Sequence, residues 1–122
     1  MLVCVDSDAE IEFCKQAFGA IELSRRVGQA GEVVHATLRI GDDMFMVHGQ
    51  YPHLKSMAPG NDGSSPVVIY LYIGDVDVLI DRAVKAGAEI LLPPADQPWG
   101  DRVGRVMDPA GHVWNLAAHL NS

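Results

Sequence analysis

Three short segments of this sequence carry side chains that could do chemistry at alternating positions. Tyr70 and Tyr72 alternate in "IYLY", Met46 and His48 alternate in "DMFMVH", and Asn115 lies in "HVWNL". Because successive side chains of a strand point to opposite faces of the sheet, residues two positions apart share one face. Two phenol hydroxyls, an imidazole and an amide on a mainly apolar wall would suit an organic ligand with a flat or apolar body.

Histidines and one tryptophan are the next candidates for contact with a ligand. His48 has the strongest claim because it shares the parity of Met46, but it has no predicted carboxylate partner and could equally be a hydrogen-bonded wall residue. Trp99, in "PWGDR", is expected in a loop beside the cavity mouth, where its ring could stack on a ligand or cover the core. Exposed or turn-capping positions are expected for His53, His112 and His119.

Motifs of several other chemistries are missing from the sequence. It has no glycine-rich phosphate loop between a strand and a helix, no nucleophile elbow and no paired thiols at metal-ligand spacing. Its two cysteines, Cys4 and Cys14, are expected to be small buried apolar side chains. The acidic pair Asp42 and Asp43 is predicted to lie in a hairpin turn and to be solvated.

Composition and charge limit the classes to which the chain can belong. Its 122 residues are 48% hydrophobic, and a chain of this length and composition can form one compact domain with a core. It is too short to form two independent domains. A formal net charge of −7 disfavours nucleic acid as a partner and would attract cationic ligands to an acidic cleft. No apolar run approaches the ~20 residues of a membrane span, and the start lacks a secretory pattern, so we expect no membrane partner and a cytoplasmic location.

One plan of elements occurs in both halves of the sequence. In each half a short apolar strand leads to an amphipathic helix, which a glycine, Gly19 or Gly87, is expected to end. Three segments of period-two alternation then follow, so each half predicts a β-α-β-β-β module. The predicted helix caps are Asp6 or Asp8 in the first half and Asp75 or Asp77 in the second.

The two modules align almost without gaps. Asp6 matches Asp75 and Met46 matches Asn115, since 75 minus 6 and 115 minus 46 both give 69. We expect a single domain over residues 1–122, with a first module at 1–48, a connection at 49–66 and a second module at 67–122. The connection is rich in glycine, proline and serine, so it is expected to be flexible and could act as a lid.

Strand parity then selects the side chains that would line a cavity between the modules. If Met46 and Asn115 face inward, their strand neighbours Phe45, Val47, Trp114 and Leu116 should pack against the helices. The predicted ligand-binding cleft consists of Met46, His48, Val68, Tyr70, Tyr72 and Asn115, with Trp99 near its mouth. The same register aligns Arg39 with Asp108, so the charges of Arg39 and Asp108 could form a structural pair between the halves. Arg39 shares a strand face with His35.

A family resemblance runs over nearly the whole chain. The segments "DAEIEFCKQAFGA", "HATLRIGD", "LYIGDVDVLIDRAVKAGA" and "WGDRVGRVMDPAGHVWNLAAH" resemble the glyoxalase, bleomycin-resistance and extradiol-dioxygenase superfamily, also called the vicinal oxygen chelate fold. The similarity is greatest to its small bacterial bleomycin-resistance and glyoxalase-like proteins. It implies an α+β fold in which two βαβββ modules form a curved mixed sheet around a shared cleft, and usually a homodimer. This fold hosts isomerases, lyases, dioxygenases, thiol transferases and non-catalytic drug binders.

Metal-dependent members of this superfamily place ligands near the start of each module's first strand and in each final strand. The matching positions here are Val68, Met46 and Asn115, and the fourth would lie before Met1. Valine offers no donor, methionine a soft thioether and asparagine a neutral oxygen, so these positions suit a divalent cation poorly. We therefore expect no metal and no cofactor in the cleft.

The sequence thus predicts a metal-free binding protein that holds a small organic molecule, cationic or aromatic in character, in the sheet cleft. The alternative is a metal-dependent lyase, isomerase or dioxygenase of the same superfamily, with metal supplied by His48, an upstream residue or a partner chain. A metal-independent enzyme that uses an acid or base of the cavity is a third reading. We expect a homodimer, because two open half-sheets leave apolar faces that one small chain covers poorly.

Overall fold

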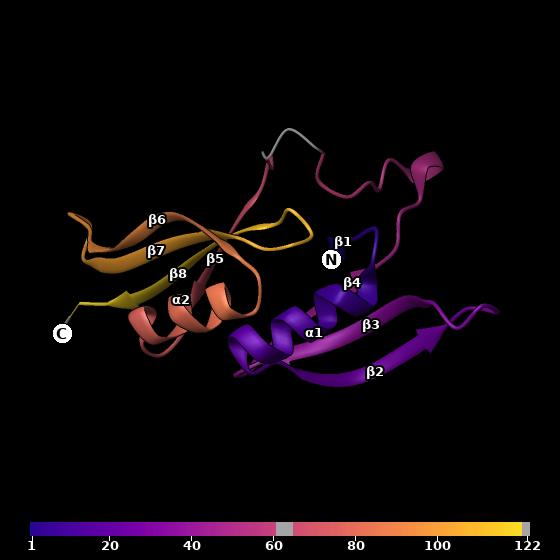
Figure 1. The fold of residues 1–122 in the computed structure, drawn as a ribbon, viewed down its shortest axis with the longest axis horizontal. Coiled ribbons are helices and arrows are strands. Elements are labelled where there is room, and N and C mark those ends of the chain that lie inside the picture. Colours follow the sequence, from indigo (N-terminus) through magenta and orange to yellow (C-terminus); the bar gives the residue numbers. More distant parts are fainter. Residues whose placement is uncertain (61–64, 121–122) are drawn as a thin grey trace.

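A computed structural model of the chain describes residues 1–60 and 65–120 and contains two modules with one order of elements (Figure 1). The first module consists of β1 (Leu2–Val3), α1 (Ser7–Phe18), β2 (Ile21–Val27), β3 (Val33–Ile40) and β4 (Asp43–His48). The second consists of β5 (Val68–Tyr72), α2 (Val76–Lys85), β6 (Glu89–Asp96), β7 (Asp101–Met107) and β8 (Val113–His119). Among the described residues, no helix is long and apolar enough to cross a membrane.

Each module forms its own four-stranded mixed sheet, in the order β1-β4-β3-β2 and β5-β8-β7-β6. The first strand of each module runs parallel to the last one, with Leu2 opposite Val47 and Leu71 opposite Leu116. These pairs confirm the repeat register of 69 residues in three dimensions. Two mixed sheets with one helix each make an α+β fold, as the sequence predicts, although the strands form two separate sheets rather than a single one.

Both helices begin at the first of the two aspartates that the sequence offers as caps. The Asp6 carboxylate accepts the backbone N–H of Ala9 at 3.1 Å, and the Asp75 carboxylate accepts that of Val78 at 3.3 Å. These bonds satisfy N–H groups that have no partner within the first turn of a helix. At the other end of α1, Gly19 adopts a left-handed backbone with φ of 68°, which a glycine adopts without strain.

The predicted alignment of Arg39 with Asp108 is wrong, because the two hairpins differ in length. The turn between β7 and β8 is longer than the turn between β3 and β4, so Arg39 aligns with Met107 and Asp108 falls in the longer turn. There the buried Asp108 carboxylate accepts two backbone N–H groups of its own turn and the indole N–H of Trp114. Its partners are therefore local groups rather than the exposed side chain of Arg39.

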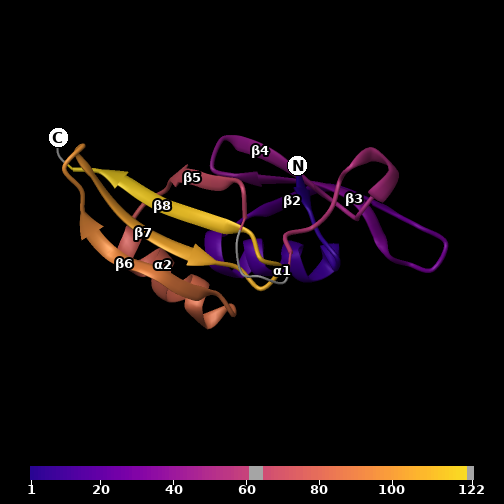
Figure 2. The ribbon, with the colours of Figure 1, turned by 90° about the horizontal axis from the view of Figure 1, so that it is seen from above.

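The two helices lie side by side at the centre of the elongated molecule (Figures 1 and 2). Trp114 of β8 reaches across this junction, with its ring centroid 4.7 Å from that of Phe18 and 6.2 Å from that of Phe45. Val47, Trp114 and Leu116 are buried in the core and Phe45 packs against it, which confirms the side of the strands predicted to face the helices.

Both cysteines are buried, as predicted, yet their surroundings are not purely apolar. The thiol of Cys4 lies 3.9 Å from one carboxyl oxygen of Glu10, and the thiol of Cys14 lies 3.6 Å from the other. Burial, and after it the charge of Asp108, raises the pKa of Glu10 to about 9. The Glu10 side chain is therefore protonated at neutral pH, when it can both donate and accept hydrogen bonds.

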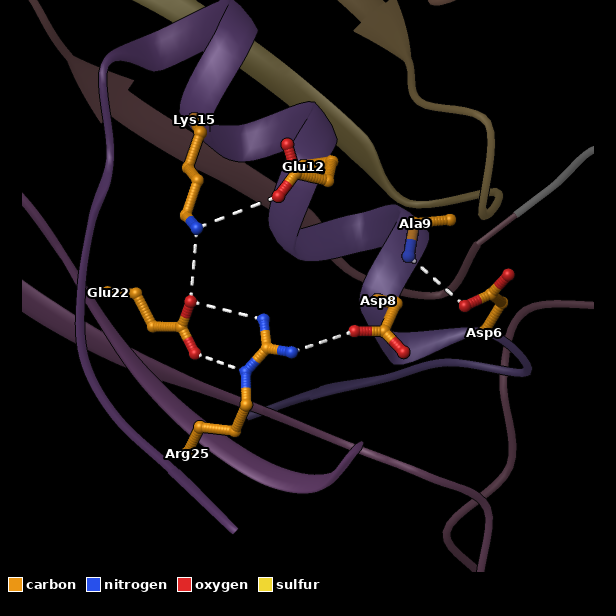
Figure 3. A network of polar contacts seen from close by, with 7 residues as sticks. All are labelled: Asp6, Asp8, Ala9, Glu12, Lys15, Glu22 and Arg25. Atoms are coloured by element: carbon orange, nitrogen blue, oxygen red, sulfur yellow. Dashed lines mark hydrogen bonds and ion pairs between the residues drawn. The ribbon is translucent and has the colours of Figure 1, made fainter. Parts of the chain in front are cut away.

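A network of exposed ion pairs fastens α1 to β2 (Figure 3). Arg25 donates to both oxygens of Glu22 and to Asp8, and Lys15 donates to Glu22 at 3.0 Å and pairs with Glu12 at 3.6 Å. The hydrogen bonds from Arg25 are the main cause of a lowered pKa for Glu22. Since Arg25, Asp8 and Glu12 are exposed, the network fixes the position of β2 more than it adds to stability.

The connection between the modules contains local structure that the sequence did not predict. Residues 51–56 form a turn around the short 3-10 helix η1 (Pro52–Leu54), closed by a bridge between Tyr51 and Ser56. Backbone hydrogen bonds close this turn, so this part of the connection has local order, while its flexibility stays a prediction. Residues 61–64 of the same connection lie outside the described residues.

Candidate functional site

The helix-free face of the second sheet brings together Val68, Tyr70, Tyr72 and Asn115. Tyr70 of β5 lies opposite Asn115 of β8, and Val68 and Tyr72 occupy the positions two residues away on the same strand. All three β5 side chains are exposed, whereas Asn115 is buried at 8% exposure. Strand alternation thus places an apolar and phenolic wall on the side of the sheet that carries no helix.

A buried carboxylate, Asp101 at the start of β7, is the centre of polar contacts on this face. Its Oδ2 atom accepts the hydroxyl groups of Tyr70 at 2.7 Å and of Tyr72 at 2.8 Å. Its Oδ1 atom lies 3.1 Å from Nδ1 of His119, whose side chain is 76% exposed. We call Asp101, Tyr70, Tyr72, Trp99 and His119 the Asp101 cluster.

The hydrogen bonds set the charges of this cluster. The hydroxyls of Tyr70 and Tyr72 stabilise the Asp101 carboxylate and lower its pKa below the ordinary value. The same carboxylate raises the pKa of Tyr72 to about 12, and burial followed by Asp101 raises the pKa of Tyr70. At neutral pH the site therefore holds one negative charge between two uncharged phenols.

Aromatic rings surround the carboxylate. Trp99 is 63% exposed and donates its indole N–H to the hydroxyl of Tyr70 at 3.2 Å. The rings of Tyr72 and His119 are stacked, with centroids 4.4 Å apart and an interplanar angle of 22°. Of the two predicted roles for Trp99, this exposed position fits a ring at the rim of a site better than a cover of the core.

Sequence analysis missed Asp101 and His119, although both have a signal in the sequence. His119 continues the parity of Asn115 on β8, and Asp101 occupies the face of β7 that Arg105 shares. His119 was expected to be exposed, which its side chain is, but its contact with Asp101 depends on how β7 and β8 pair.

Asn115 is held by Arg105 from the neighbouring strand. The Nε group of Arg105 donates to Oδ1 of Asn115 at 2.7 Å, so the only strong acceptor of this amide is already engaged by a cation. The matching family positions Val68 and Met46 supply no hard donor. Side chains at these three positions therefore do not fit a divalent metal ion, and a guanidinium beside Asn115 adds electrostatic repulsion to the missing ligands.

Met46 and His48 lie on the first sheet, apart from the Asp101 cluster in the strand order. Met46 is 38% exposed on β4, while His48 is buried, with Nδ1 2.6 Å from the carbonyl oxygen of Gly49 and its ring beside Tyr51. This local bonding favours the wall role for His48. A cavity of about 690 Å³ lies between the modules. Among the described residues that line it, Tyr70 is the one member of the seven-residue cleft that the sequence predicts.

Comparison with protein families matches residues 1–116 to the Glyoxalase/Bleomycin resistance protein/Dioxygenase superfamily. An uncharacterized protein of Mycobacterium bovis is 43% identical over 118 residues, which cover 94% of this chain and 78% of that protein.

Solved structures with the same fold cover almost the whole chain. TioX from Micromonospora sp. ML1 is 32% identical, with a TM-score of 0.78 over 98% of this chain and 94% of that one. A gene product of Arabidopsis thaliana is 28% identical, with a TM-score of 0.76 over 96% and 93% of the two chains. The fosfomycin resistance protein FosX from Mesorhizobium loti, 18% identical with a TM-score of 0.66 over 96% and 86%, shares the fold alone.

Proposed function

The chain belongs to the Glyoxalase/Bleomycin resistance protein/Dioxygenase superfamily, and on that premise we propose that it binds a small aromatic cation on the helix-free face of its second sheet, without a metal ion there. One observation carries the proposal: the Asp101 carboxylate is buried and held by two phenols within a ring of exposed aromatic side chains. Binding, rather than catalysis, is the role that this arrangement supports best.

A cation on this face would meet attraction from two sources. The Asp101 carboxylate supplies a charge that its two tyrosine bonds keep ionised, and the faces of Tyr72 and Trp99 attract a positive charge through their π electrons. Because the side chain of His119 is largely exposed, it can leave Oδ1 of Asp101 to the ligand, which would also free the face of Tyr72 on which it stacks. The net charge of −7 would also raise the rate at which cations arrive.

Calorimetric titration with two matched probes tests the proposal. N-methylacridinium carries a permanent charge, while acridine has the same ring system and is neutral at mildly alkaline pH. We expect N-methylacridinium to bind more tightly than acridine. Asp101→Asn should lower its affinity by about tenfold or more, whereas Asp42→Asn, which removes the same charge from an exposed turn, should not. Equal affinity for both probes, or an equal loss in both variants, would contradict the proposal.

A homodimer is part of this proposal, because the first sheet exposes apolar side chains on its own helix-free face. Met44, Met46 and Ile21 are all exposed there, and a second copy of the chain would remove them from water. Sedimentation equilibrium should give a dimeric mass, and Met46→Glu should favour the monomer. Leu54→Glu, at an exposed position of the connection, is the control. A monomeric mass at micromolar concentration would refute the dimer.

A further inference from the structure

Three side chains with metal-ligand chemistry converge where the two modules meet. Cys4 follows β1, Glu10 lies in α1, and His112 lies in the turn before β8. Their potential ligand atoms all lie within 4.8 Å of one another. The Cys4 sulfur is 3.7 Å from Nε2 of His112 and 3.9 Å from Oε2 of Glu10. Contrary to expectation, His112 is half-buried, and its Nε2 also lies 2.9 Å from the carbonyl oxygen of Val3.

We propose that Cys4, Glu10 and His112 bind one zinc ion through the sulfur, a carboxylate oxygen and Nε2. A tetrahedral zinc ion with Zn–S of about 2.3 Å and Zn–N and Zn–O of about 2.0 Å sets adjacent ligand atoms about 3.5 Å apart. The two distances from the Cys4 sulfur exceed this value only slightly, and the Glu10 and His112 atoms lie within 4.8 Å of each other, so side-chain rotations would complete the geometry. A thiolate, an imidazole and a carboxylate are also donors that zinc prefers.

A zinc ion would supply the charge that an ionised Cys4 and Glu10 need at this place. Cys4 is fully buried and Glu10 is 1% exposed, so a thiolate and a carboxylate here would be very costly without a compensating charge. The two negative charges together match the charge of one zinc ion. Binding would release the protons of the Cys4 thiol and the Glu10 carboxyl group. It would also move the ring proton of His112 from Nε2 to Nδ1, so the hydrogen bond from Nε2 to the carbonyl oxygen of Val3 would be lost.

A route from solvent reaches Glu10 of the cluster. A cavity of about 400 Å³ is lined by Glu10 and by Asp108, with the exposed Asp6 among its other residues. Asp108 also accepts the backbone N–H of His112, which fixes the turn that presents the imidazole. The site is separate from the Asp101 cluster, and its ligands come from both modules, so a bound ion would tie the modules together.

Cobalt(II) is the first probe, added to protein freed of metal by chelation. A sulfur-to-cobalt charge-transfer band together with the visible bands of tetrahedral cobalt is expected at one ion per chain, and zinc should displace the cobalt. Zinc should also raise the melting temperature of the wild-type protein, because a ligand that binds only the folded state stabilises it. If folded wild-type protein shows no charge-transfer band, the proposal is wrong.

Matched variants locate the ion. Cys4→Ser should abolish the charge-transfer band, while Cys14→Ser, which removes the other thiol beside Glu10, should keep it. His112→Gln should lower zinc affinity by about tenfold or more, and His119→Gln should leave it unchanged.

Equal loss of the band in both cysteine variants, or zinc affinity in His112→Gln equal to that of wild type, would overturn the assignment. Should Cys4→Ser fail to fold, the wild-type cobalt spectrum and the histidine pair decide the question. A cobalt ion bound without the sulfur band and lost in Asp101→Asn would instead place a metal on the proposed ligand face and contradict the proposed function.

Discussion

Replacing Trp114 by phenylalanine should destabilise the protein strongly, because this side chain joins the two modules. Its ring packs against Phe18 and Phe45 of the first module, and its indole N–H donates to the buried carboxylate of Asp108 at 2.9 Å. Phenylalanine keeps part of the ring contact but leaves Asp108 Oδ2 without this donor. A hydrogen bond to a charged group contributes about 1.5–3 kcal/mol, and the smaller ring leaves a cavity that costs about 1–2 kcal/mol more.

The expected loss is therefore about 2.5–5 kcal/mol, a large share of the ~5–15 kcal/mol that holds a typical domain together. Urea unfolding followed by far-ultraviolet circular dichroism measures it. Trp99→Phe is the matched control, since Trp99 is mostly exposed and should change stability by no more than about 0.5 kcal/mol. A loss in Trp114→Phe below about 1 kcal/mol, or equal to that of the control, would refute the idea that this indole joins the modules.

Three further predictions concern charge and packing. The pKa of Asp101 is lowered in the folded state, so the contribution of this carboxylate to stability and to cation binding should be complete above pH 3.8, its ordinary pKa. The contribution should be lost as the pH falls through the lower pKa of the folded state. Affinity for N-methylacridinium at a series of pH values checks this, and a loss of affinity already near neutral pH would contradict it. Arg25→Ala should cause a small loss of stability that disappears in high salt, because Arg25 and Asp8 are exposed and Glu22 is only half-buried. Melting temperatures at low and high salt measure this loss, and a loss that persists in high salt would show a different origin. Gly104→Ala should cost about 1–3 kcal/mol, since a Cβ atom there would lie 2.7 Å from Cδ1 of Ile80. Adding Ile80→Val, which removes this Cδ1 atom, should restore part of the lost free energy of unfolding, as measured in urea. If the double variant lost as much free energy of unfolding as the sum of the two single variants, the result would argue against a local clash.

The fold was largely predictable because the sequence states the same plan twice. Apolar periodicity changes from helix to strand at equivalent points, and the capping residues Asp6 and Asp75 lie at equivalent positions of the repeat. Parity within strands was equally reliable, because Trp114 and Leu116 are buried and Asn115 faces the other way. Local periodicity is enough for these features, since each depends on residues close together in the chain.

The polar contacts of the sites were not predictable in the same way. The bonds of Asp101 depend on how β7 and β5 flank β8, and the convergence of Glu10 and His112 depends on how the two modules dock. One extra residue of hairpin length was enough to make the predicted partner of Asp108 wrong. Register between strands and the docking of modules are set by tertiary packing, which a repeat length alone does not specify.

Within residues 1–60 and 65–120, each strand pairs only inside its own module, and this separation has a consequence for local unfolding. The modules meet mainly through α1, α2 and the aromatic contacts of Trp114, so each sheet can open with limited disturbance of the other. Amide hydrogen exchange should then give two opening free energies, one for β3 and one for β7. An aromatic cation on the second sheet would slow exchange in β7 alone, whereas zinc held between Cys4 and His112 would slow exchange in both halves and bring the two values closer together.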